Sequence, residues 1–83
     1  MEIHDSADPL ERFLLDAIRE KRTVKFTFIG VEEATRRKVR PIRLVRVADF
    51  GRTYLEGYCE TRQALRTFSL HRIAAPSHSR SRR

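Results

Sequence analysis

The sequence predicts a mainly β domain with one N-terminal helix. With 83 residues, the chain is long enough for a single domain with one compact core. Apolar residues recur at helical spacing near the N-terminus, and beyond residue 23 they recur at every second position. Proline and glycine then divide the remainder into short segments of strand character. One helix followed by a small β structure accounts for all three observations.

The helix is predicted over residues 9–21. Asp8 can cap the first free backbone amides, Pro9 suits the first helical position, and Glu11 can complete a capping box. One face carries an apolar stripe made of Leu10, Phe13, Leu14, Ala17 and Ile18. We expect this stripe to pack onto the core, because the opposite face is acidic and therefore unsuited to a membrane surface. Residues 1–8 are predicted to form an N-terminal segment before the domain.

The first two strands differ in regularity. Apolar and polar residues alternate over residues 24–28, which is typical of a half-buried strand. Residues 35–47 resemble a longer strand, but their alternation slips between Ile42 and Val45. Pro41 has no N–H to donate to a sheet, so we expect an edge position or a bend there.

The second half of the chain contains two further strands and a short closing one. A tight hairpin turn is predicted at Asp49, Phe50 and Gly51. The segments after it are predicted as strands over residues 52–59, 64–70 and 72–74, with a loop at residues 60–63.

Positive charge is concentrated behind the helix. The formal net charge is +7, yet residues 1–20 carry six acids and two arginines, so residues 21–83 carry a net charge of +11. This asymmetry favours an anionic partner, nucleic acid first among them, over a surface that is merely solvated. Residues 76–83, with the sequence PSHSRSRR, have little apolar surface and are predicted to be a flexible basic tail. The domain itself is then expected to span residues 9–75.

Two motifs resemble the core signature of a known family. Residues 53–59 have the sequence TYLEGYC, and residues 66–73 have the sequence RTFSLHRI. The bacterial WYL domain carries runs of the type WYLxAYC and RxFRLDRI at about this spacing. Upstream, LLDAIREKRTVKFTF is similar to the helix and first strand of that family, and RRKVRPIRLV to its second strand with an internal proline. The resemblance covers roughly residues 10–75.

The resemblance implies both a fold and a site. WYL domains are small Sm-like, SH3-like barrels, so a five-stranded barrel with an N-terminal helix is expected. They are typically the C-terminal sensor parts of DNA-binding regulators, which implies a sensor that stands alone here, without its DNA-reading module. In this family, arginines at the positions of Arg66 and Arg72 help line a basic pocket for nucleotide-like or nucleic-acid ligands.

Four residues depart from the family pattern. Thr53 replaces the eponymous tryptophan, and Phe28 replaces a common tyrosine. Ser69 replaces a common arginine, which removes one phosphate donor. His71 replaces a common aspartate, which makes the site more positive below the titration point of the imidazole.

Aromatic residues are candidates for stacking on a base, as in proteins that bind single-stranded nucleic acid. Tyr54 and Phe28 are the two considered. For Phe28 a core position is favoured, since it belongs to the alternating strand, whereas Tyr54 fits either role equally well.

A cluster of cations without an acid is the second candidate site. It consists of Arg36, Arg37, Lys38, Arg40, Arg43 and Arg46. We expect Lys38, Arg40 and, beyond the slip, Arg46 to share a face with Arg36. Such a row suits a phosphate backbone, because arginine binds oxyanions bidentately. The alternative is a solvated strand face with ion pairs to Glu32, Glu33 or Glu56.

Catalysis, metals and cofactors find little support in the sequence. The three histidines are scattered, and with the single Cys59 they form no metal-ligand spacing. The glycines are isolated rather than grouped in a phosphate-binding loop. Ser69 and His71 share a strand face, but no acid stands beside them to orient a hydrolytic dyad. Cys59 is expected to be a small buried residue.

We therefore predict a non-catalytic, cytoplasmic regulatory module that uses no cofactor and no membrane. It is expected to recognise single-stranded nucleic acid or a nucleotide-type anion, in transcription or defence-system regulation. The alternative is a protein-interaction module that partners a DNA-binding regulator, and a homo-oligomer is expected in either case. A single cysteine and the lack of an apolar leader in residues 1–5 agree with a cytoplasmic site.

Overall fold

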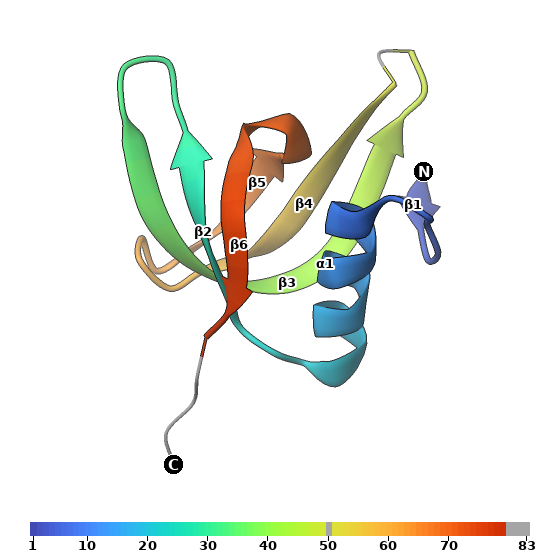
Figure 1. Cartoon of the computed structure of the whole chain (residues 1–83), viewed down its shortest axis with the longest axis horizontal. Coiled ribbons are helices and arrows are strands. Elements are labelled where there is room, and N and C mark those ends of the chain that lie inside the picture. The colour runs from blue at the N-terminus through green and yellow to red at the C-terminus, as the bar shows by residue number, and fades with distance from the viewer. Residues whose placement is uncertain (50, 80–83) are drawn as a thin grey trace.

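The computed structural model describes residues 1–49 and 51–79, which form one helix and an antiparallel six-stranded sheet (Figure 1). The elements are β1 (Glu2–Ile3), α1 (Pro9–Glu20), β2 (Val24–Ile29), β3 (Ala34–Val47), β4 (Arg52–Cys59), β5 (Ala64–Ser69), the 3-10 turn η1 (Leu70–Arg72) and β6 (Ile73–His78). The strand order is β5-β4-β3-β2-β6, and β1 pairs with β3 beside this path. The predicted mainly β fold with one helix is confirmed.

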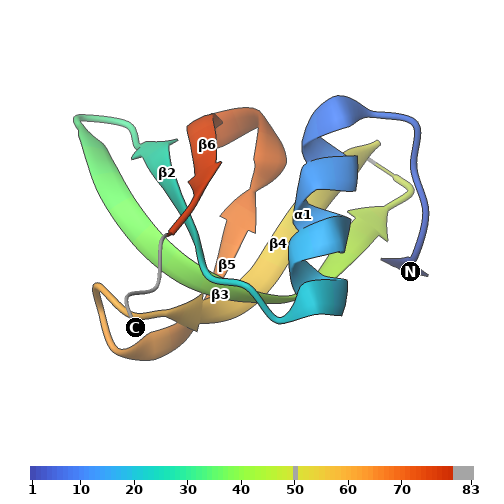
Figure 2. The same cartoon turned by 60° about the horizontal axis from the view of Figure 1, so that its bottom comes forward.

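The β structure differs in detail from the predicted five-stranded barrel, because it has six strands and the sheet is open. Within the described residues, β5 pairs with β4 and β6 pairs with β2, which leaves both as edge strands. The turn η1 joins them in place of a hydrogen-bonded pair, and its first residue, Leu70, had been predicted as strand. Leu70 is buried, so its side chain anchors the turn on the core. Figure 2 shows the chain passing from β5 to β6 through this turn.

Strand β3 is long and curved because its partner changes along its length (Figure 1). Residues 34–39 pair with β2, whereas residues 39–47 pair with β4. The register with β4 shifts between Pro41 and Arg43, which is a β-bulge at Ile42. This bulge explains the slip in the alternation, and the bend predicted at Pro41 is present in a central strand rather than an edge strand.

The core lies between one face of the sheet and α1. Phe68 packs edge to face on Phe26 and Phe28, with ring centroids 5.3 and 5.2 Å apart. From the helix, Leu14 and Ala17 are fully buried. The predicted stripe therefore faces the core, with Leu10, Phe13 and Ile18 partly buried at its margins and Leu15 buried in addition. The helix ends at Glu20, one residue earlier than predicted, and Lys21 closes it in the left-handed conformation with φ 57°.

Strands extend further toward both termini than the sequence indicates. Glu2 and Ile3, predicted to precede the domain, pair with Val45 and Leu44 of β3. At the other end, β6 continues to His78, so the predicted tail does not begin at Pro76.

The extension of β6 has a backbone cause. Ala75 and Pro76 stand opposite the single residue Phe26 in a second bulge, where Ala75 adopts φ 51°. A bulge accommodates proline, which has no N–H for the ladder. Pairing through the backbone needs no apolar side chains, which is why low hydrophobicity did not reveal it. Phe50 of the predicted hairpin turn and residues 80–83 of the predicted tail lie outside the described residues.

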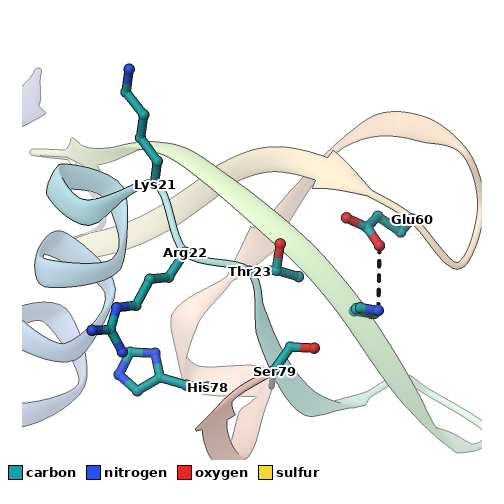
Figure 3. A pocket seen from close by; sticks show the side chains of 7 residues that line it. Lys21, Arg22, Thr23, Glu60, His78 and Ser79 are labelled. Atoms are coloured by element: carbon teal, nitrogen blue, oxygen red, sulfur yellow. Dashed lines mark ion pairs between the residues drawn. The ribbon is translucent and has the colours of Figure 1, made fainter. Parts of the chain in front are cut away.

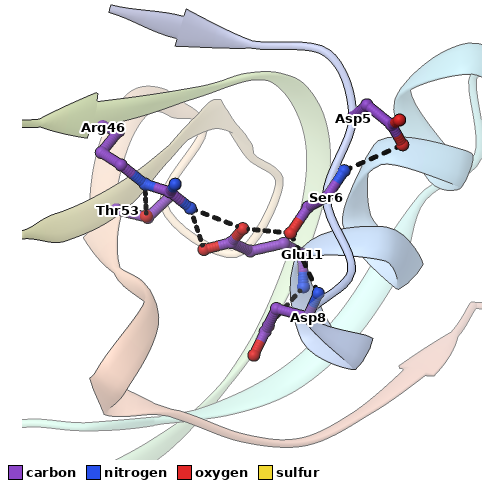
Figure 4. A network of polar contacts seen from close by, with 6 residues as sticks. All are labelled: Asp5, Ser6, Asp8, Glu11, Arg46 and Thr53. Carbon is purple, nitrogen blue, oxygen red and sulfur yellow. Dashed lines mark hydrogen bonds and ion pairs between the residues drawn. The ribbon is translucent and has the colours of Figure 1, made fainter.

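A partly buried polar network joins α1 to the sheet (Figure 4). Arg46 Nη2 donates to both carboxylate oxygens of Glu11, at 2.7 and 2.8 Å, and Arg46 Nε donates to Thr53 Oγ1 at 3.2 Å. Asp8 caps the helix as predicted, accepting from the Glu11 amide at 3.0 Å. The predicted capping box does not form between Asp8 and Glu11. Ser6 Oγ instead accepts a hydrogen bond from the Asp8 amide and donates one to Glu11 at 2.5 Å.

Glu11 should therefore titrate below the range of an ordinary glutamate. Burial alone would raise the pKa of its carboxyl group, but hydrogen bonds from Ser6 and Arg46 and the charge of Arg46 together lower the pKa below its usual 4.5. A lowered pKa in the folded state contributes stability above about pH 4.5, and this contribution is lost as the pH falls through the folded-state value.

Thermal unfolding of the wild type and of Glu11→Gln at decreasing pH tests this linkage. Between about pH 6 and pH 3 the wild type should lose more melting temperature than the variant, because the variant carries no titrating group at this position. Circular dichroism measures both, and Asp16→Asn on the exposed face of α1 controls for the loss of one acidic charge. Equal losses in the wild type and Glu11→Gln would show that the network does not couple protonation to folding.

Candidate functional site

Four exposed cations form a band on the outer face of β2 and β3. Before the bulge, the even-numbered residues of β3 point away from the core while Val39 and its odd-numbered neighbours are buried. The register places Lys25 of β2 directly opposite Lys38, so that both lie on this outer face. We call this set the cation band; its members are Lys25, Arg36, Lys38 and Arg40.

The cation band is poorly neutralised. Lys38 Nζ lies 3.7 Å from Glu60, and this is a long contact between partly exposed groups. Arg36 uses Nη1 to donate to Thr27 Oγ1 at 2.9 Å and to the Ala75 carbonyl at 3.5 Å. Within residues 1–49 and 51–79, neither Lys25 nor Arg40 forms an ion pair. Like charges directly opposite one another destabilise a sheet, so this arrangement is unfavourable for folding alone.

Lys38 lines two hollows. The larger one, of about 750 Å³, lies where the end of α1 meets the start of β2 and the end of β6 (Figure 3). It is lined by Lys21, Arg22, Thr23, Lys38, Glu60, His78 and Ser79. The smaller one, of about 330 Å³, is lined by Lys25, Arg36, Arg37, Lys38 and Thr61. The left-handed cap at Lys21 turns the chain toward β2. Lys21 and Arg22 thereby line the same hollow as Lys38.

Four residues that line the two hollows were not predicted as site residues, namely Lys21, Arg22, Lys25 and His78. Lys21 and Arg22 follow the end of α1, whereas Lys25 lies on β2 and His78 on β6. The turn after α1 and the pairing of β2 with β3 and β6 bring them near Lys38. The one available signal was Lys25, a cation at a polar position of a predicted strand.

Arg37 and Arg46 lie on the inner side of the sheet, not with the outer cations. Arg37 is only 8% exposed, with its guanidinium carbon 5.7 Å from the Phe28 ring centroid and its Nε donating to Thr35 Oγ1 at 3.0 Å. Arg46 was expected to share a face with Arg36, but the bulge reverses the alternation and turns it toward Glu11. Phe28 packs on Phe68, as the favoured core interpretation of this residue requires.

Cys59 is buried beside Arg37, as predicted for a small core residue. Arg37 Nη1 lies 3.9 Å from its sulfur. Burial alone would raise the pKa of the Cys59 thiol, but hydrogen bonds from the Arg62 backbone and from Arg37 lower it. Among the described residues, only Arg37 and the backbone of the loop at residues 61 and 62 interact with this thiol.

Arg43 and Arg66 line one hollow, whereas Arg72 lies elsewhere. The β5 hollow, of about 280 Å³, is lined by Ile42, Arg43, Glu56, Gly57, Leu65, Arg66 and Thr67. Arg43 pairs with Glu56 at 2.8 Å, one of the acids considered as its partner. Arg72 follows the other end of β5, and its Nη1 donates to the Ile29 carbonyl at 3.0 Å.

The remaining predicted residues gather near the start of β4. Ser69 lies opposite Tyr54, and Ser69 Oγ is 2.6 Å from His71 Nδ1. His71 also lines a hollow of about 360 Å³ with Asp8, Leu10, Glu11, Gly51, Arg52, Thr53 and Leu70. Tyr54 is paired with Val45 beyond the bulge, whereas Tyr58 of the same strand is paired with Arg40 of the cation band.

The structure thus defines a small mainly β domain with an under-neutralised cationic face. The WYL domain family model matches residues 11–77, so this chain belongs to the WYL domain family. Among solved structures, it is similar to proteasome accessory factor B/C (PafBC) of Arthrobacter aurescens, with 28% sequence identity and a TM-score of 0.75. The match covers 89% of this chain and 12% of that one. No curated protein matches the chain. In the described residues, no helix has the length and apolar character needed to cross a membrane.

Removing one charge of the Lys25–Lys38 pair should stabilise the domain. Lys25→Gln relieves the cross-strand repulsion, so the free energy of unfolding should rise by up to about 1 kcal/mol at low salt. The gain should shrink as salt screens the pair in the wild type. Urea denaturation at two salt concentrations measures both effects, with Arg12→Gln on the exposed face of α1 as the matched loss of one cation. A less stable Lys25→Gln would contradict the repulsion.

Proposed function

We propose that this chain is a non-catalytic regulatory binding module for phosphate-bearing ligands, either nucleic acid or a nucleotide-type anion. The observation that carries the proposal is the unfavourable placement of Lys25 directly opposite Lys38. A bound anion would offset the repulsion between these two lysines, because each would then lie beside a negative charge. Membership in the WYL domain family supports the regulatory part, which we place in cytoplasmic transcription or defence-system control.

The cation band has the spacing and the free donors that phosphate recognition needs. Residues two apart on a strand lie about 6.6 Å apart, so Arg36, Lys38 and Arg40 present a regular row. Both hydrogen bonds of Arg36 come from Nη1. Its Nε and Nη2 hydrogens have no partner in the described residues, and they remain for an oxyanion.

The acidic N-terminal part of the chain gives the molecule a polarity. Residues 1–20 carry four more acids than bases, although Asp16 and Glu20 on α1 are paired with Arg19 and Arg22. The net negative charge of this part of the chain repels a polyanion, whereas the cation band attracts it. Arg43 and Arg66 provide a second cationic edge at the β5 hollow, while Arg72 holds η1 to the end of β2.

A protein-interaction role is the second candidate, and the open edge of β5 favours it. Within the described residues β5 pairs only with β4, so its outer backbone groups can accept another strand. Such an interface would form a homo-oligomer or join a DNA-binding regulator. It would tolerate salt, whereas binding through the cation band would weaken as salt rises.

Binding to a fluorescent oligonucleotide at several salt concentrations tests the proposal. Lys38→Ala should weaken binding and reduce the slope of log affinity against log salt by about 1, because one phosphate contact is lost. Arg12→Ala, the same kind of charge loss on α1, should leave the slope unchanged.

A chain that ends at Ser79 separates the domain from the three arginines that follow. It should keep the Lys38 dependence. If the truncated chain loses all binding while Lys38→Ala in the full chain has no effect, the residues after Ser79 are the binder and the cation band is not.

A further inference from the structure

The exposed apolar side chains of the molecule fall into two clusters. Apart from Met1, the large apolar side chains that residues 1–49 and 51–79 expose are Ile29, Val31, Ile42 and Leu65. Ile29 and Val31 lie at the turn between β2 and β3, which we call the β2–β3 tip and define as residues 29–33. Ile42 and Leu65 line the β5 hollow. Single exposed apolar residues are common, whereas clusters of them indicate contact surfaces.

The β2–β3 tip presents its apolar residues in a fixed conformation. The Gly30 amide donates to the Glu33 carbonyl at 2.8 Å, and Arg72 Nη1 donates to the Ile29 carbonyl at 3.0 Å. Val31 is 90% exposed, and Figure 1 shows the turn between β2 and β3 at an outer corner of the molecule. A segment that is already held in one conformation loses little conformational freedom when it binds.

The two clusters carry opposite charge. Glu32 and Glu33 of the tip form no ion pair within residues 1–49 and 51–79. At the β5 hollow, Arg66 likewise has no ionic partner among the described residues, while Arg43 is paired with Glu56 at 2.8 Å. The tip thus has uncompensated negative charge, and the hollow has a net positive charge. Such complementary charges favour contact between the two surfaces.

The tip cannot reach the hollow of its own chain. Ala34, directly after the tip, and Ile42 in the hollow are eight residues apart on β3, which corresponds to about 26 Å along a strand. Both residues belong to one hydrogen-bonded sheet, so they stay apart. The hollow of about 280 Å³ has room for an aliphatic side chain such as that of Val31. Contact between tip and hollow therefore requires two copies of the chain.

We propose that the β5 hollow is a docking site for the β2–β3 tip of a second copy of this chain. Val31 then lies between Ile42 and Leu65, and the glutamates of the tip lie beside Arg66. This inference goes beyond the proposed function, because the cation band takes no part in it. It also differs from strand addition at the β5 edge, which uses backbone groups and needs no side chain at Val31.

Analytical ultracentrifugation of the wild type and of two variants tests this docking. The wild type should self-associate reversibly as its concentration rises. Val31→Ser in the tip and Leu65→Ser in the hollow should each raise the dissociation constant at least about tenfold, because an apolar side chain no longer becomes buried. Both residues are exposed in the single chain, so circular dichroism should show that the fold is unchanged.

A mixture of the two variants shows whether tip and hollow meet each other. The Leu65→Ser chain keeps an intact tip and the Val31→Ser chain an intact hollow, so the mixture should associate more tightly than either variant alone. Arg12→Ser on the exposed face of α1 should associate like the wild type. A wild type that remains monomeric at millimolar concentration would overturn the docking. Undiminished association of Val31→Ser, or a mixture no tighter than the single variants, would overturn it as well.

Discussion

The bulge in β3 is the constraint on which the rest of the structure depends. Before it, the even-numbered residues of β3 face outward, and after it the even-numbered Leu44 faces the core opposite Leu55. Without the extra residue at Ile42, every later side chain of β3 would change faces. Leu44 would then leave the core, and Arg46 would point away from Glu11. The bulge thereby allows one strand to present cations outward in its first half and to hold α1 in its second.

Strand β3 carries charge in two different arrangements, a satisfied ion pair between Arg46 and Glu11 and the poorly neutralised cation band. Glu11 is buried, and Ser6 and Arg46 satisfy its carboxylate, so the cost of desolvation is offset by hydrogen bonds. Lys25 and Lys38 are exposed, and their repulsion is offset only in part by Glu60. The first arrangement stabilises the fold without a ligand. The second keeps a charge imbalance that an anion can relieve.

Local signals predicted the local structure, and pairing between distant segments decided the rest. Asp8 and Pro9 predicted the start of α1, and residues 52–59 form a strand with the predicted bounds. The open sheet, the strand at Glu2 and the extension of β6 to His78 depend on backbone partners far away in the sequence. For the same reason the cluster around Arg36 was predicted without Lys25, which only the β2–β3 register places beside it. Arg37 was misplaced because its burial depends on Phe28 and Phe68 across the sheet.

The central claim is that the outer face around Lys38 is the ligand surface of this WYL domain. A proton–nitrogen correlation spectrum, recorded while a short single-stranded oligonucleotide is added, tests it residue by residue. The amide signals of Lys25, Lys38 and Tyr58 should shift in proportion to bound ligand, while those of Arg12 and Asp16 on the exposed face of α1 should not. Shifts centred instead on Tyr54, Ser69 and His71, with the Lys38 region unchanged, would contradict it.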